Sequence, residues 1–208
     1  MRAMPTPALF LDRDGVINVD HGYVHRVDQF DFMPGIFDLC RLARARQHRI
    51  VVITNQAGIG RGMYSEDDFH AITKWMRERF EQEGAAIDAV YFCPSHPTEG
   101  VGRYRVESSD RKPGPGMILR AAAELNLDLA QSVLLGDKPS DVLAGEAAGV
   151  GRLMLLRATG TTRNPQDVPE RCIEVADLSS AAQALITAPA APTRHWHSAA
   201  PRRRVPPA

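Results

Sequence analysis

The sequence lacks a long apolar segment. Its longest unbroken apolar run, Ala89–Cys93, has five residues, whereas a transmembrane helix needs about 20. The first ten residues also lack an apolar stretch of the length found in signal peptides. These absences predict a cytoplasmic protein that has no membrane partner.

Cysteine is scarce, and neither sign of charge is in excess. The three cysteines, Cys40, Cys93 and Cys172, are odd in number and far apart, which excludes a disulfide framework and fits a reducing compartment. The 25 basic residues balance the 25 acidic ones. Electrostatics therefore give no reason to expect nucleic acid as the main partner.

Proline and arginine are concentrated at one end of the chain. Residues 188–208 contain five of the 15 prolines, four arginines and no acidic residue, a composition that predicts a disordered tail. Residues 1–187 carry four more acidic than basic residues and have a length suited to one folded domain.

The predicted domain alternates short apolar runs with segments of helical period. Five runs have the composition of strands buried on both faces, namely residues 8–11, 50–53, 89–92, 133–135 and 153–156. Helical segments are expected at residues 36–43, 69–80, 117–125 and 141–148, and Ser65 with Asp68 can cap the second of these. The alternation predicts an α/β fold, a Rossmann-like doubly wound parallel sheet with helices on both faces.

Polar residues follow three of the predicted strands, at the sheet edge where such folds bind ligands. They are Asp12 and Asp14, then Thr54, Asn55 and Gln56, then Asp137, while Lys112 lies in a segment that can enter from the side. The three carboxylates would repel one another without a cation, and Mg²⁺ prefers such oxygen ligands. The lysine and the neutral polar groups suit a phosphate, so the pattern predicts phosphoryl transfer.

Four ordered motifs resemble those of a known superfamily. They are Phe10–Asn18 (FLDRDGVIN), Thr54–Gln56, Arg111–Pro113 and Gly136–Asp137. Their order is similar to that of the haloacid dehalogenase superfamily of aspartate-nucleophile phosphatases. Residues 18–25 and 55–62 further resemble the D,D-heptose 1,7-bisphosphate 7-phosphatases, whose near relatives are histidinol-phosphate phosphatases. The resemblance covers residues 7–156, continues more weakly to 186, and implies the haloacid dehalogenase fold.

The resemblance implies a role for each motif. Asp12 would be the nucleophile that forms an aspartyl-phosphate, and Asp14 the general acid and base. The implied Mg²⁺ ligands are Asp12, the Asp14 backbone carbonyl, Asp137 and the backbone of Lys138. Phosphate and substrate contacts would come from Thr54, Asn55, Gln56, Arg111 and Lys112, and from the loop of Asp20, His21, Gly22 and Tyr23.

Structural roles compete with several of these assignments. The Asp12–Gly15 motif has the composition of a turn, and Arg111 with Lys112 could be an ordinary solvated pair. Asp141 could support the metal site or simply stabilise the N-terminus of its helix. The glycines of the 58–62 segment lack the spacing of a nucleotide-binding loop and favour turn geometry.

One departure from the family concerns zinc. Many heptose phosphatases carry a structural zinc, and the aligned ligand positions here are Cys93, Ser95, Ser108 and Asp110. Only the cysteine is retained, whereas a structural zinc needs four good ligands. We predict that zinc is absent. The loop from Cys93 to Asp110 would then be held by packing or by ion pairs among Glu99, Arg103, Arg105 and Glu107.

The spacing of the motifs leaves no room for a separate cap domain. Only 39 residues lie between Asp14 and Thr54, and 57 between Thr54 and Lys112, so loops must cover the site. We expect a monomeric Mg²⁺-dependent phosphatase that removes the C7 phosphate of D-glycero-D-manno-heptose 1,7-bisphosphate, a sugar phosphate used for lipopolysaccharide precursors. Three alternatives stay open: histidinol-phosphate phosphatase, a 3′-phosphatase of nucleic acid ends, and a non-catalytic binding protein.

Overall fold

Six parallel strands form one sheet. The computed structural model describes residues 4–157 and 167–187. The strands are β1 (Ala8–Leu11), β2 (Arg49–Asn55), β3 (Ala89–Cys93), β4 (Val133–Gly136), β5 (Arg152–Leu156) and β6 (Ile173–Val175). Their order is β3-β2-β1-β4-β5-β6, and every neighbouring pair is parallel. The order reverses between β1 and β4, which is where ligands bind in sheets of this type.

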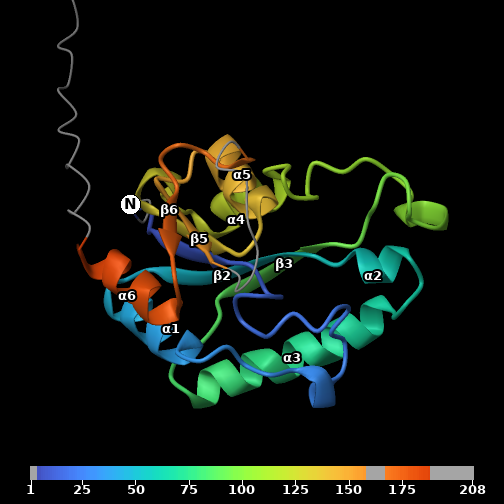
Figure 1. Cartoon of the computed structure of the whole chain (residues 1–208), viewed down its shortest axis with the longest axis horizontal. Coiled ribbons are helices and arrows are strands. Elements are labelled where there is room, and N and C mark those ends of the chain that lie inside the picture. Colours follow the sequence, from blue (N-terminus) through green and yellow to red (C-terminus); the bar gives the residue numbers. More distant parts are fainter. Residues whose placement is uncertain (1–3, 158–166, 188–208) are drawn as a thin grey trace, which may run out of the picture.

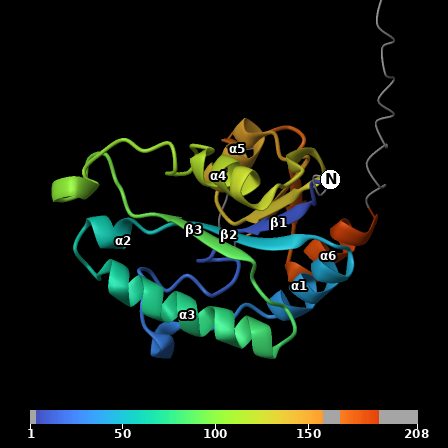
Figure 2. The ribbon, with the colours of Figure 1, turned by 180° about the vertical axis from the view of Figure 1, so that it is seen from behind.

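Helices cover both faces of the sheet. Figure 1 and Figure 2 show α1 (Ile36–Ala45), α3 (Glu66–Gln82) and α6 (Leu178–Thr187) on one face, with α4 (Gly116–Leu125) and α5 (Pro139–Ala148) on the other. The single turn α2 (Ala57–Gly60) lies beyond the end of β2. Short 3-10 turns span Val27–Gln29, Gly102–Tyr104 and Leu129–Gln131.

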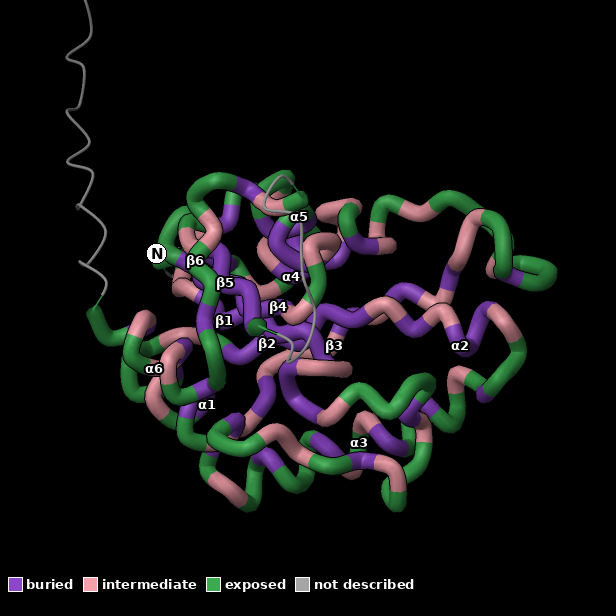
Figure 3. Tube along the Cα trace, in the orientation of Figure 1, coloured by how far each residue is buried: buried purple, intermediate pink, exposed green. Residues whose placement is uncertain are grey.

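Alternate residues of the strands enter two apolar clusters. Leu9 and Leu11 belong to the cluster beneath α1, α3 and α6, whereas Ala8 and Phe10 belong to the cluster beneath α4 and α5. Burial on both sides explains why the strand sequences are continuously apolar. Figure 3 shows this burial along the strands, while exposed residues follow the outer surfaces of the helices.

The predicted fold class and all five predicted strands are confirmed. Ser65 caps α3 as predicted, because its hydroxyl accepts from the Asp68 N–H at 3.0 Å and the Asp68 carboxylate accepts from the Ser65 N–H at 2.8 Å. Sequence reasoning missed α2, β6 and α6. The predicted tail, residues 188–208, lies outside the described residues.

Loops and short turns cover the carboxyl ends of the strands. Within the described ranges, residues 13–35 and 94–115 contain no helix longer than a 3-10 turn and no strand of the sheet, so they form no cap domain. No helix of the described chain is long and apolar enough to cross a membrane.

Candidate active site

Three carboxylates meet where the strand order reverses. Asp12 directly follows β1 and Asp137 directly follows β4, and the Asp12 N–H donates to the Leu135 carbonyl at 3.1 Å. Carboxylate oxygens of Asp12, Asp137 and Asp141 lie within 4.8 Å of one another. The three carboxylates expected here were those of Asp12, Asp14 and Asp137, and the structure places Asp141 in the position expected for Asp14.

Asp141 caps its helix, as one of its two predicted roles requires, and it also contacts Lys112. Its Oδ2 accepts from the backbone N–H groups of Asp137 and Lys138 at 3.1 and 2.9 Å, which caps α5. Its Oδ1 lies 2.7 Å from Nζ of Lys112. Gly136 permits this approach, since a Cβ there would lie 2.2 Å from the Asp141 Cβ.

The backbone of Lys138, which was predicted to contribute to the metal site, takes part in capping α5. Its carbonyl accepts from the Asp141 N–H at 3.0 Å, and its own N–H donates to the Asp141 carboxylate. The capping of α5 therefore uses both backbone groups. The side chain instead places Nζ 3.1 Å from Asp20 and 3.8 Å from Asp137.

Lys112 is buried among the acids. Its Nζ lies 2.8 Å from Asp12 Oδ1 and donates to the Ile53 carbonyl at 3.0 Å. Asn55 fixes the Lys112 backbone, accepting from its N–H at 3.0 Å and donating to its carbonyl at 3.1 Å. Asn55 thus positions Lys112, while the predicted contact of Asn55 with phosphate stays a prediction.

Burial shapes the electrostatics of this group. It raises the pKa of Asp12 to about 7, against the lowering effect of Lys112, and Asp141 and Asp137 raise it further. Burial likewise raises the pKa of Asp137 to about 6, with Asp141 adding to the effect. Burial lowers the pKa of Lys112, but Asp12 and Asp141 outweigh it and bring that pKa to about 12. The Lys112 ammonium therefore stays charged, and it is a single charge in contact with two carboxylates, those of Asp12 and Asp141.

The acidic cluster fits a hard divalent cation. Its donors are all oxygens, which Mg²⁺ prefers, and the raised carboxylate pKa values show that additional positive charge would be stabilising there. Gly15 gives the cluster its space. Its φ is +93°, and a Cβ would lie 2.3 Å from Asp137 Oδ2.

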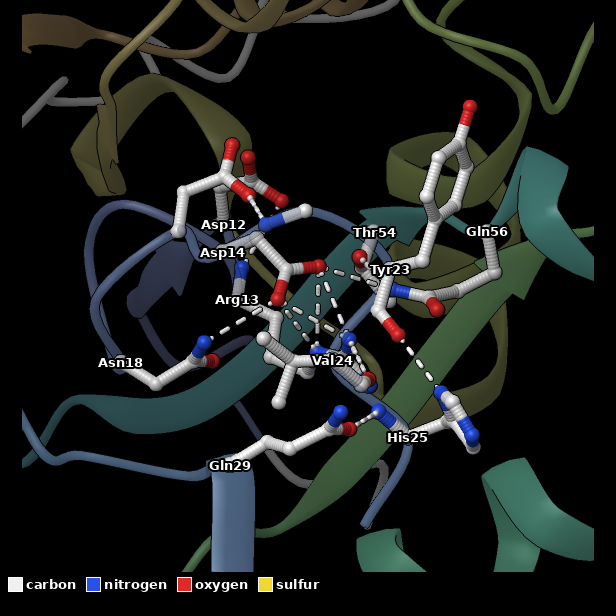
Figure 4. A network of polar contacts seen from close by, with 12 residues as sticks. Asp12, Arg13, Asp14, Asn18, Tyr23, Val24, His25, Gln29, Thr54 and Gln56 are labelled. Atoms are coloured by element: carbon white, nitrogen blue, oxygen red, sulfur yellow. Dashed lines mark hydrogen bonds and ion pairs between the residues drawn. The ribbon is translucent and has the colours of Figure 1, made fainter.

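Asp14 lies in a separate polar network beside the cluster (Figure 4). Its carboxylate is paired with the Arg13 guanidinium at 2.9 Å and accepts from Asn18 Nδ2 at 3.1 Å and Gln56 Nε2 at 3.0 Å. Gln56 Nε2 also donates to Thr54 Oγ1 at 2.8 Å. This network joins the loop after β1 to the end of β2.

Arg13 is a contributor that sequence reasoning missed. Its side chain is 1% exposed, donates to the Val24 carbonyl at 2.6 Å, and lies 5.8 Å from the centroid of the Phe69 ring. Its position between the two motif aspartates was the only available signal. Arg13 holds both Asp14 and the residue that directly follows Tyr23 in the chain.

The predicted substrate loop lies beside the acidic cluster. Asp20 accepts from the Gly22 N–H at 3.0 Å and pairs with Lys138, and these contacts lower its pKa although burial opposes them. His21 turns outward and lies 2.8 Å from Asp31. Tyr23 is exposed and has a φ of +53°.

Arg111 reaches into the loop that follows β3. Its Nη1 donates to the Ser95 carbonyl at 3.3 Å, so this loop positions the predicted sugar contact.

The four positions aligned with zinc ligands line one hollow of about 610 Å³. These positions are Cys93, Ser95, Ser108 and Asp110. Together they offer one thiol, two hydroxyls and one carboxylate, which do not fit a structural zinc.

The ion pairs of this loop differ from those predicted within it. Glu99 pairs with Arg61, which follows α2, and Arg103 lies 3.4 Å from Glu66 at the start of α3. The Tyr104 hydroxyl donates to the same Glu66 carboxylate at 2.7 Å. The loop is therefore fastened to the segment from α2 to α3. Within the loop, His96 Nε2 lies 3.6 Å from a carboxylate oxygen of Glu99.

A pocket of about 440 Å³ opens beside the acidic cluster. Gly15, Asp20 and Asp137 line one side of it, and Arg157 and Leu178 line another. Arg157 follows β5 and Leu178 begins α6, so α6, which sequence reasoning missed, helps to shape the space next to the site.

Comparison with known proteins agrees with this geometry. Residues 109–179 match the profile of the family described as HAD-hydrolase-like. The crystal structure of D,D-heptose 1,7-bisphosphate phosphatase from B. bronchiseptica, complexed with magnesium and phosphate, covers 86% of this chain and 98% of its own. Its TM-score is 0.73 and its sequence is 29% identical. The fold and the site together define a phosphatase of the haloacid dehalogenase superfamily.

Two curated relatives identify the family within this superfamily. The D-glycero-alpha-D-manno-heptose-1,7-bisphosphate 7-phosphatase of Burkholderia mallei is 54% identical over 175 residues, or 79% of this chain and 93% of the relative. The D-glycero-beta-D-manno-heptose-1,7-bisphosphate 7-phosphatase of Vibrio cholerae is 49% identical over 154 residues, or 74% and 83%. The chain belongs to the D-glycero-D-manno-heptose-1,7-bisphosphate 7-phosphatase family, which confirms the resemblance seen in residues 18–25 and 55–62.

Proposed function

We propose that this chain hydrolyses the C7 phosphate of D-glycero-D-manno-heptose 1,7-bisphosphate, a step toward lipopolysaccharide precursors, with Asp12 as the nucleophile. The observation that carries the proposal is the buried contact between Asp12 and Lys112 beside Asp137 at the reversal of strand order. This contact presents a carboxylate and an ammonium to the same phosphate. The names of the curated relatives, 44–54% identical, supply the substrate.

Asp12 and Lys112 carry the first step. The Asp12 carboxylate attacks phosphorus while the bond from phosphorus to the sugar oxygen breaks, which leaves an aspartyl-phosphate. Lys112, together with Thr54, donates to the phosphoryl oxygens as charge shifts among them. Asn55 supports this step by holding the Lys112 backbone.

Asp14 moves the protons. It donates a proton from its carboxyl group to the leaving sugar oxygen, and then accepts one from the water that attacks the aspartyl-phosphate and releases inorganic phosphate. Arg13, Asn18 and Gln56 orient the Asp14 carboxyl through the contacts of Figure 4.

The acidic cluster would hold Mg²⁺ through Asp12, Asp137 and the Asp14 backbone carbonyl, with Asp141 beside them. When bound, Mg²⁺ supplies positive charge that reduces repulsion between an anionic nucleophile and an anionic phosphate. The sugar and its second phosphate would contact Arg111 and the loop of Asp20, His21, Gly22 and Tyr23. The enzyme needs neither zinc nor a partner chain in this proposal.

A phosphate-release panel with Mg²⁺ tests the proposal. It contains both heptose 1,7-bisphosphate anomers, because the curated relatives are named for different anomers, together with histidinol phosphate and a 3′-phosphorylated oligonucleotide. We expect the largest kcat/KM for a heptose bisphosphate. A clear preference for histidinol phosphate or the oligonucleotide would assign the corresponding alternative, and release from no substrate would favour a non-catalytic role.

A further inference from the structure

Arg61 connects loops from three strand ends. It follows α2, and its guanidinium donates to the hydroxyl of Tyr23 in the loop after β1. The guanidinium carbon also lies 5.7 Å from the centroid of the Tyr23 ring. On its other side, Arg61 pairs with the carboxylate of Glu99, in the loop after β3. One side chain thus joins the predicted substrate loop to the loop that positions Arg111.

Close backbone approaches strengthen this junction. A Cβ at Gly58 would lie 2.8 Å from Cδ1 of Tyr23, and a Cβ at Gly60 would lie 2.4 Å from the Pro94 carbonyl oxygen. The Gly60 carbonyl accepts from the Val101 N–H at 2.8 Å. Gly58 and Gly60 therefore let both loops dock directly on α2.

We propose that Arg61 is a positioning residue that selects the sugar substrate by fixing Tyr23 against the loop of Glu99. The inference rests on the proposed function, in which Tyr23 contacts the sugar. Tyr23 has a positive φ, which a non-glycine residue keeps only when neighbouring groups hold it. Arg61 supplies that hold from outside the loop.

The junction is exposed, so removing its ion pair should affect substrate binding more than the stability of the fold. The Arg61 side chain is 30% exposed and that of Glu99 is 55% exposed, and an ion pair this open to water contributes little to stability. Loss of the pair therefore shifts the position of the Tyr23 and Glu99 loops but has little effect on the stability of the folded chain.

The two partners of Arg61 distinguish positioning from direct substrate contact. If Arg61 itself bound an anionic group of the substrate, Glu99 would compete with it, and Glu99→Gln would lower KM. In the positioning role Glu99 helps to hold Arg61 against Tyr23. Glu99→Gln then raises KM, as Arg61→Ala does, and the double variant is little worse than either single one.

The experiment compares heptose 1,7-bisphosphate with p-nitrophenyl phosphate, which carries no sugar, in the presence of Mg²⁺. For Arg61→Ala and Glu99→Gln we expect KM for the heptose bisphosphate to rise by about tenfold, with kcat changed by less than about twofold. Kinetics with p-nitrophenyl phosphate stay unchanged. Arg61→Lys recovers part of the loss because an ammonium can keep one of the two partners.

Arg105→Ala is the matched control. Arg105 lies on the same loop as Glu99, and its exposed side chain forms no ion pair with another residue that the structure describes, so its loss leaves both substrates unaffected. Thermal unfolding of each variant reports folding, and Glu99→Gln keeps the test valid where Arg61→Ala is unstable.

Three results overturn the inference: an unchanged KM in Arg61→Ala, an equal loss with both substrates, or a lower KM in Glu99→Gln. Failure of the proposed function has a different signature. In that case the wild-type chain itself turns over heptose bisphosphate no faster than p-nitrophenyl phosphate.

Discussion

Replacing Gly15 with alanine tests the acidic cluster through a single methyl group. The φ of +93° at Gly15 costs an L residue about 1–2 kcal/mol. The added Cβ would lie 2.3 Å from Oδ2 and 2.5 Å from Cγ of Asp137. Favourable contacts between carbon atoms lie at about 3.5–4.0 Å, so Asp137 must withdraw by roughly 1 Å.

Such a withdrawal exceeds what a metal site tolerates, because ligand distances hold to within about 0.2 Å. We therefore expect the half-saturating Mg²⁺ concentration for phosphate release to rise by about tenfold, which corresponds to about 1.4 kcal/mol. Thermal unfolding with increasing Mg²⁺ provides a second measurement that does not depend on turnover.

Gly84→Ala is the matched control for this substitution. Gly84 has a φ of +69°, and a Cβ there would meet no heavy atom within 4 Å. Both variants carry a similar backbone cost, but only Gly15→Ala displaces a carboxylate of the cluster. The reasoning is refuted if the two variants need the same Mg²⁺ concentration for half-maximal activity.

Three further predictions concern the nucleophile, the carboxylates of the acidic cluster and the positions aligned with zinc ligands. Asp12→Asn removes the nucleophile, so phosphate release falls to background while the thermal unfolding curve stays cooperative; near wild-type turnover would contradict the assignment. In the metal-free protein, the pKa values of Asp12 and Asp137 are raised to about 7 and about 6. Protonation of these two carboxyl groups therefore stabilises the folded chain fully below about pH 4, and this stabilisation is lost as the pH rises toward 7. Because Mg²⁺ competes with those protons, its addition should raise Tm more at about pH 8 than at about pH 5.5, and equal shifts would argue against the carboxylates as ligands. Metal analysis of the purified protein should find no stoichiometric zinc, since Ser95 and Ser108 are poor zinc ligands, and about one zinc per chain would overturn this prediction.

The central strands were predictable because each is buried on two faces. Residues 8–11 and 133–135 form continuous apolar runs, since α helices cover both sides of β1 and β4. The short edge strand β6 gives no such signal, because Ile173 is 44% exposed and only Val175 of its three residues is buried. The turn α2 depends on close approach by Tyr23 and Pro94, which are distant in sequence.

The residues at the strand ends could be predicted because the carboxyl ends of parallel strands meet at one edge of the sheet. The direction of the Asp14 side chain could not be predicted. Alternation along an extended segment places residues 12 and 14 on the same side. The chain instead turns directly after Asp12, with the Ile17 N–H donating to the Arg13 carbonyl at 2.8 Å. The turn directs Asp14 to Arg13, a pairing that depends on three-dimensional contacts, and Asp141 completes the acidic cluster.

The zero net charge of the chain conceals a local imbalance that links metal and substrate. Asp12, Asp137 and Asp141 face Lys112, while the nearby Lys138 is closer to Asp20 than to Asp137. Buried charge without enough opposite charge is costly, and the raised pKa values of Asp12 and Asp137 are its signature. A dianionic phosphate entering this cluster alone would increase the imbalance, whereas a divalent cation reverses it. The same acids that make the cation favourable therefore give a physical reason for it to bind before the phosphate.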